Sequence, residues 1–198
     1  MPDMPDLAAL IGSRICHDLI SPIGAIGNGV ELLMMDGTPQ SPELALIAES
    51  AGHANARIRF FRVAFGAATP DQRIARAEIL SILSEATRGG RLRIDWEGGP
   101  DLARQRARLL FLLVQCLESA MPYGGRIAVS EDGEGAGLTG TAAKLRLHRP
   151  LWSALEGGPC PDDLGAAEVH FALAAAELAR QGRRLALAID EGGIRMTL

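Results

Sequence analysis

One stretch near the N-terminus decides the fold: residues 13–26, SRICHDLISPIGAI. Around it, apolar residues recur at spacings of three to five, which predicts a long helix with one apolar stripe. The stripe consists of Leu7, Leu10, Ile15, Leu19, Pro22, Ile26, Val30 and Leu33. His17 precedes Leu19 by two residues, about 200° round a helix that turns roughly 100° per residue. We therefore expect His17 to point away from the stripe and into solvent.

The helical face around His17 consists of small or polar residues. Ser21, Gly24 and Asn28 continue it, with Ile20 beside them. A glycine inside a helix costs about 1 kcal/mol relative to alanine, so helix propensity does not explain Gly24. Because glycine lets another surface approach closely, we interpret this face as a docking surface for a partner protein.

A second helix is predicted to fold back on the first. Residues 36–40 (DGTPQ) are rich in turn formers, and Ser41 followed by Pro42 has the pattern of an N-cap and a first helical residue. Apolar residues then alternate spacings of three and four, which is typical of helix-bundle packing. They are Leu44, Ile47, Ala51, Ala54, Ile58, Phe61 and Phe65.

An antiparallel hairpin of two helices buries too little apolar surface by itself. We therefore expect a homodimer in which two hairpins form a four-helix bundle. Folding the hairpin near residue 38 brings Arg57, Arg59 and Arg62 close to His17, where one or more of them would meet an acidic partner. The alternative interpretation for each arginine is a solvated basic helix face.

Composition excludes several classes of protein. The 198 residues carry a net charge of -4, and the isoelectric point near 5.6 argues against a nucleic-acid surface. Three widely spaced cysteines suit a reducing compartment better than a disulfide framework. The longest apolar run, residues 109–114, is far shorter than the ~20 residues that cross a bilayer. With no basic N-terminal region either, we expect a soluble, cytoplasmic protein without a membrane partner.

The periodicity changes after residues 66–70 (GAATP), so we predict a first domain at residues 1–68 and a second at 69–198. In the second domain, helices and mostly antiparallel strands interleave, which favours an α+β fold with a two-layer α/β sandwich. Asp101 is the expected cap of the helix that contains Leu109 to Leu117. The other predicted elements are helices at 76–87 and 166–181 and strands at 91–97, 124–130, 139–148, 184–189 and 194–198.

The first helix resembles a known motif. His17-Asp18-Leu19 with Pro22, followed by Ile26 and the residues ELL at 31–33, is similar to the H-box of histidine-kinase dimerisation and phosphoacceptor domains, whose core is H-[DE]-L-x-x-P. The resemblance implies that His17 is the residue that carries a phosphoryl group. The three arginines would then also be candidates to hold that group.

The second domain resembles the ATP-binding domain that follows the phosphoacceptor hairpin in histidine kinases, but its nucleotide motifs are altered. Residues 115–127 look like the kinase N-box, with Ser119 in place of the magnesium-binding asparagine and Gln115 in place of an earlier one. The glycine-rich residues 131–137 fall in a hairpin loop, and residues 149–158 contain no aspartate where the adenine-binding box belongs. We therefore expect a degenerate domain with no ATP, metal or other cofactor.

Together, the hairpin and the degenerate domain resemble dimeric histidine phosphotransferases of the ChpT type. The family's activity is to accept a phosphoryl group from the receiver domain of a hybrid kinase and to pass it to receiver domains of response regulators. That implies relay through His17, a magnesium ion supplied by the receiver, and phosphotransferase rather than kinase activity. Asp18 would bond the ring or assist proton transfer, or it is simply a solvated carboxylate.

Two other functions remain open at this point. An ATP-dependent histidine kinase with atypical nucleotide boxes would phosphorylate itself, and a non-catalytic dimeric adaptor would dock receivers without using His17. A metal pair formed by Cys16 and His17 is disfavoured, because adjacent residues point to different faces of a helix.

Overall fold

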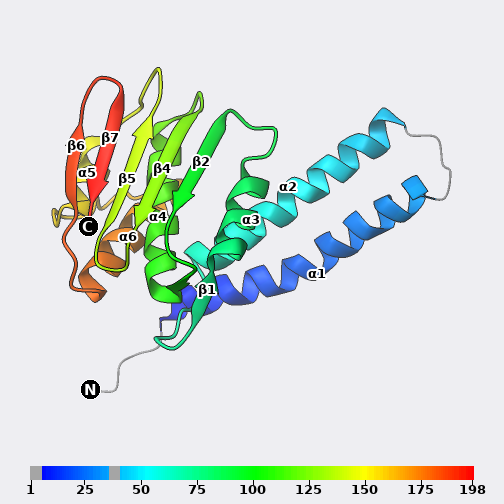
Figure 1. Ribbon diagram of the computed structural model, residues 1–198, viewed down its shortest axis with the longest axis horizontal. Helices are drawn as coiled ribbons and strands as arrows, with labels where there is room; N and C mark the ends of the chain where they lie inside the picture. The colour runs from blue at the N-terminus through cyan, green and yellow to red at the C-terminus, as the bar shows by residue number, and fades with distance from the viewer. Residues whose placement is uncertain (1–5, 36–40) are drawn as a thin grey trace. The chain divides into compact units, whose positions relative to one another are not determined.

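The computed structural model describes residues 6–35 and 41–198, and the predicted turn at 36–40 lies outside them. The chain forms two compact units, Met1–Ala68 and Thr69–Leu198. The first is a hairpin of two long helices, α1 (Leu7–Met35) and α2 (Pro42–Ala64) (Figure 1). The second contains a sheet covered by helices.

The helical hairpin begins its second helix as predicted. Ser41 is the N-cap of α2, and its Oγ accepts a hydrogen bond from the Leu44 N–H at 3.2 Å. Pro42 follows in the first turn, where the missing N–H costs nothing. In α1, Pro22 lies inside a helix that continues on both sides of it.

Close contact between α1 and α2 occurs near the open end of the hairpin. A Cβ added to Gly12 would lie 3.0 Å from the Phe65 carbonyl oxygen, and the Ser13 Oγ accepts a hydrogen bond from the Ala67 N–H at 2.8 Å. Most of the predicted apolar stripe of α1 is exposed instead: Ile15, Leu19, Ile26 and Leu33 are 45–53% exposed, whereas Val30 is buried.

The second unit contains a mixed five-stranded sheet in the order β2-β4-β5-β7-β6. Its strands are β2 (Leu92–Glu97), β4 (Gly125–Glu131), β5 (Ala136–Thr141), β6 (Ala186–Ile189) and β7 (Gly193–Thr197). Only the β2–β4 pair in this sheet is parallel. Two short strands, β1 (Arg73–Ala75) and β3 (Asp101–Ala103), form a separate antiparallel pair that the sequence did not predict.

Helices cover one face of the sheet (Figure 1). They are α3 (Arg76–Ala86), α4 (Arg104–Ala120), α5 (Arg149–Leu155), the short 3-10 turn Ala166–Glu168 and α6 (Val169–Arg180). Along β4, Ile127 and Val129 are buried while their neighbours are exposed, so one sheet face forms the core. In α4, residues 109–114 are fully buried. The predicted α+β fold with a two-layer sandwich is therefore confirmed.

The predicted cap at Asp101 is wrong. Asp101 lies in β3, and its carboxylate accepts hydrogen bonds from Nε and Nη2 of Arg73 at 2.7 and 2.6 Å. The N-cap of α4 is Ala103, which makes no side-chain cap bond. The Arg104 N–H instead donates to the Gln72 carbonyl at 2.8 Å, so the short β1–β3 pair supplies the acceptor that a capping side chain would otherwise provide.

The strand predicted at 139–148 is also misplaced. The strand is β5, and it ends at Thr141 opposite Arg126. The chain then leaves the sheet. The Arg146 N–H donates a hydrogen bond of 2.8 Å to the carbonyl of Ala120, the last residue of α4. The start of the strand was not recognised because the glycines at 133, 135, 137 and 140 interrupt the alternation of apolar and polar side chains.

Two glycines allow a test of this backbone geometry. Gly124 and Gly89 both have positive φ, 93° and 70°. A Cβ at Gly124 would lie 2.4 Å from the Arg91 carbonyl oxygen, whereas a Cβ at Gly89 meets nothing within 4 Å. Gly89→Ala should lower the free energy of unfolding by about 1 kcal/mol. Gly124→Ala should lower it by at least about 3 kcal/mol, because backbone must also move. Equal losses in urea denaturation would contradict this geometry.

Candidate functional site

His17 lies on α1 with its ring open to solvent. Its side chain is 84% exposed, as predicted from the helical pattern. The ring Nδ1 lies 3.2 Å from Oδ1 of Asp18, the next residue. A carboxylate only accepts hydrogen bonds, so this contact places the ring proton on Nδ1. In the neutral form of this ring, the other ring nitrogen, Nε2, then carries the lone pair.

Asp18 is held in turn by Arg14. The Arg14 Nε donates to Asp18 Oδ2 at 2.7 Å across one helical turn. Both contacts lower the pKa of the Asp18 carboxyl, the hydrogen bond from His17 more than that from Arg14. The sequence reasoning missed Arg14, although its spacing of four residues from Asp18 is a recognised signal of a helical ion pair. Exposed pairs of this kind orient side chains more than they stabilise a fold.

The small residues around His17 leave the helix surface open. Ser21 and Asn28 are exposed, while Ile20 and Gly24 are half-buried. A Cβ added to Gly24 would have no heavy atom within 4 Å. Packing against the second helix of the hairpin therefore does not require a glycine at position 24. Close approach of a partner protein is a physical reason for having one.

The three arginines predicted near His17 lie on the C-terminal half of α2, with different surroundings. Arg57 lies over the Phe61 ring, 4.9 Å from its centroid, and is half-buried like Arg59. Arg62 is exposed. Burial raises the pKa of the Cys16 thiol, and the positive charge of Arg62 partly offsets that effect. Arg62 therefore acts on the residue beside His17, across the hairpin.

The altered nucleotide motifs of the second unit serve its own structure. The Ser119 hydroxyl donates to the Cys116 carbonyl at 2.8 Å within α4. In the glycine-rich segment, Asp132 Oδ1 accepts from the N–H groups of Glu134 and Gly135, which closes the turn between β4 and β5. That segment is therefore a hairpin turn, as the sequence predicted.

Across residues 6–35 and 41–198, no group of three or more His, Cys, Asp or Glu side chains is arranged to hold a metal ion. Within the same part of the chain, no helix has both the length and the apolar character needed to cross a bilayer.

Known proteins match most of this chain. A family model described as the histidine phosphotransferase C-terminal domain matches residues 76–193. Protein phosphotransferase ChpT of Brucella abortus (strain 2308) is 37% identical over 164 residues, which cover 80% of this chain and 78% of the relative. A solved structure of a bacterial phosphotransferase covers 100% of this chain with a TM-score of 0.70 and 28% identity, and 97% of that structure is matched. The chain belongs to the histidine phosphotransferase family.

Proposed function

We propose that this protein relays a phosphoryl group between receiver-domain aspartates of a bacterial phosphorelay through His17. The observation that carries the proposal is the exposed His17 ring, whose Nδ1 lies against Asp18 and which leaves Nε2 as the nitrogen available for phosphoryl transfer. Membership of the histidine phosphotransferase family supports the same chemistry. Three free thiols suit the reducing cytoplasm, where such a relay would operate.

The proposed reaction needs only a correctly held imidazole. The Nε2 lone pair of His17 attacks the phosphorus of an aspartyl phosphate, so an N–P bond forms while the P–O bond to the aspartate breaks and the carboxylate leaves. The ring becomes cationic and keeps its proton on Nδ1, whose N–H donates a hydrogen bond to the Asp18 carboxylate. Attack by a second receiver's aspartate reverses these steps and restores the neutral ring.

In this proposal the phosphoryl group comes from outside the chain. A serine hydroxyl at 119 is a poor replacement for a magnesium-binding amide oxygen, and this hydroxyl is already bonded within α4. The receiver would supply the magnesium ion that neutralises charge during transfer. We therefore infer that the second unit is a degenerate ATPase-like domain that needs no cofactor, and we favour transfer over autophosphorylation.

The receiver would dock on the face of α1 that surrounds His17. The exposed Ser21 and Asn28 and the open surface above Gly24 let a receiver bring its aspartate close to the ring. Ile20 would form the edge of this face. Arg57, Arg59 and Arg62 on the neighbouring helix are candidates to contact the acidic pocket that receivers present.

We also propose that a second copy of this chain covers the exposed stripe of α1. Four large apolar residues on one helical face are each about half exposed: Ile15, Leu19, Ile26 and Leu33. A continuous apolar stripe of this length marks an interaction surface. By helical angle it lies nearly opposite His17, so a homodimeric four-helix bundle would bury the stripe and leave His17 accessible.

The central test is transfer from a receiver domain that has been phosphorylated with acetyl phosphate and freed of the donor. Radiolabelled phosphoryl should move to this protein, and His17→Ala should abolish that transfer by removing the nucleophile. His53→Ala is the matched control, because His53 is also exposed on the hairpin and should keep full transfer. Label acquired directly from ATP would support the kinase instead, and no label from either source would support the adaptor.

The contacts of Asp18 predict a specific titration. His17→Ala and Arg14→Ala should each raise the pKa of the Asp18 carboxyl toward its ordinary value, because the hydrogen bond from His17 and the hydrogen bond and charge of Arg14 all lower it. Carbon-13 NMR of the side-chain carboxyls measures both shifts. Asp71 is an internal control, since Thr69 lowers its pKa independently. An Asp18 pKa that is unchanged in His17→Ala would refute the contact.

The proposed dimer predicts a change of oligomeric state. Leu19→Glu combined with Ile26→Glu places two charges on the stripe and should convert dimers to monomers at micromolar concentration, because like charges would be desolvated in the bundle. Asn28→Glu adds a charge on the side of His17 and should leave the dimer intact. Analytical ultracentrifugation decides: a monomeric parent protein, or a dimer that survives the double substitution, would exclude this interface.

A further inference from the structure

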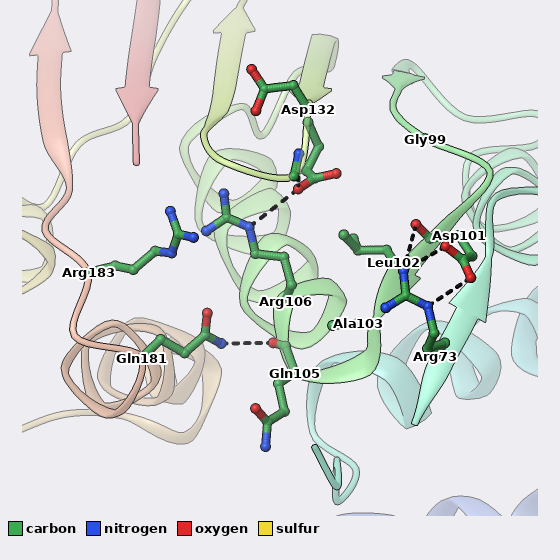
Figure 2. Close-up of a pocket in the computed structure, with 12 residues that line it drawn as sticks. Arg73, Gly99, Asp101, Leu102, Ala103, Gln105, Arg106, Asp132, Gln181 and Arg183 are labelled. Atoms are coloured by element: carbon green, nitrogen blue, oxygen red, sulfur yellow. Dashed lines mark hydrogen bonds and ion pairs between the residues drawn. The ribbon is translucent and has the colours of Figure 1, made fainter. Parts of the chain in front are cut away.

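A pocket of about 630 Å³ lies in the second unit, and residues 131–133 of the glycine-rich turn form part of its lining. Figure 2 shows its walls: the β1–β3 pair, the first turn of α4, the turn after β4 and the segment that follows α6. Ser119 belongs to the last turn of α4, whereas the pocket lies at the first turn of that helix. Neither the altered N-box nor His17 lines it.

The most unusual side chain in the pocket is Arg106. It is only 6% exposed, and no described residue forms a hydrogen bond with its Nε, Nη1 or Nη2. Glu131 Oε1 lies 3.7 Å from Nε, beyond hydrogen-bond distance, and the negative charge of Asp132 also acts on Arg106. A guanidinium carries five N–H donors and remains charged in proteins. A buried charge with unused donors is costly, so this arrangement calls for an anionic acceptor.

A second arginine reinforces the positive charge. Burial lowers the pKa of Arg106 and the like charge of Arg183 lowers it further, while Glu131 and Asp132 act in the opposite direction. Figure 2 shows Arg106 and Arg183 extending toward each other from α4 and from the segment after α6. Arg183 Nη1 donates to the Glu134 carbonyl at 2.7 Å, which holds the side chain at the pocket. Arg106 also lies in the first turn of α4, where the helix dipole is positive.

The carboxylates around the pocket are already engaged by other groups. Asp101 is bonded to Arg73 through both oxygens. Asp132 Oδ1 accepts two backbone N–H groups of the β4–β5 turn, and Glu131 Oε1 accepts a third from Gly133 at 3.0 Å. The acceptors of the cluster are therefore largely used, whereas the donors of Arg106 are not.

We propose that this pocket binds the phosphate group of a small molecule between Arg106 and Arg183. Two converging guanidinium groups suit a tetrahedral anion that offers three or more acceptor oxygens, since a carboxylate presents only two. The volume is sufficient for a phosphorylated metabolite and too large for a bare ion alone. This site is independent of the relay proposed for His17, and it places a second, non-covalent phosphate-binding function in the other unit.

Inorganic phosphate is the probe. It is titrated into the full-length protein at constant ionic strength, adjusted with chloride, while amide NMR shifts are followed for residues 99–106, 131–133 and 181–183. Acetate titrated in the same way separates phosphate recognition from general carboxylate binding. The variants are Arg106→Gln and Arg183→Gln, with Arg93→Gln as the matched control because Arg93 is an exposed arginine of β2 outside the pocket.

Phosphate should cause saturable amide NMR shifts in those three segments. Acetate should cause smaller shifts in the same segments. Arg106→Gln and Arg183→Gln should each weaken the apparent phosphate affinity at least about tenfold, while Arg93→Gln leaves it unchanged. Asp132→Asn should tighten it about two- to tenfold, because the amide keeps the turn's acceptor oxygen and loses the repelling charge. A purely structural Arg106 would not produce that gain.

Several results would overturn the proposal. They are the absence of saturable shifts at these segments, equal responses to phosphate and acetate, or unchanged affinity in Arg183→Gln. Arg106→Gln removes the cation that pairs with Glu131, which can destabilise the fold. Arg183 is only half-buried, so we expect Arg183→Gln to fold normally and to test the proposal independently of Arg106→Gln.

Discussion

The 3.6-residue period of α1 divides one helix into faces with different tasks, and the proposed function depends on that division. One face meets α2, where Gly12 touches the Phe65 backbone. A second face exposes Ile15, Leu19, Ile26 and Leu33. A third presents His17 beside Asp18. A shift of one residue in this pattern would turn His17, the proposed nucleophile, toward an apolar surface, so the proposed function requires a helix that continues through Pro22.

The second unit is organised around α4, a helix buried along most of its length. At its C-terminal end, the position that resembles a magnesium-binding asparagine is a serine bonded within the helix. At its N-terminal end, Arg106 is buried with unused donors. In our proposals, one end of this helix carries the altered N-box and does not serve nucleotide chemistry, and the other end carries the phosphate-binding pocket.

The sequence predicted those features that depend on local periodicity and turn chemistry. The exposure of His17, the cap at Ser41, the strand at 91–97 and the helix at 76–87 all follow from short-range patterns. The β1 and β3 strands were missed because three residues show no periodicity, and Asp101 was then assigned to a cap. The burial of Arg106 is invisible in the sequence, because its surroundings come from residues 131–134 and 181–183, far along the chain.

The most direct test of the relay is to locate the phosphoryl group itself. The protein is incubated with a phosphorylated receiver, digested under neutral or alkaline conditions that preserve phosphohistidine, and mapped by tandem mass spectrometry. A second, unphosphorylated receiver is then added with magnesium. The account predicts phosphate on His17 alone, in the absence of ATP, and its loss to the second receiver's aspartate. Phosphate on a different residue, or phosphohistidine that forms only with ATP, would contradict it.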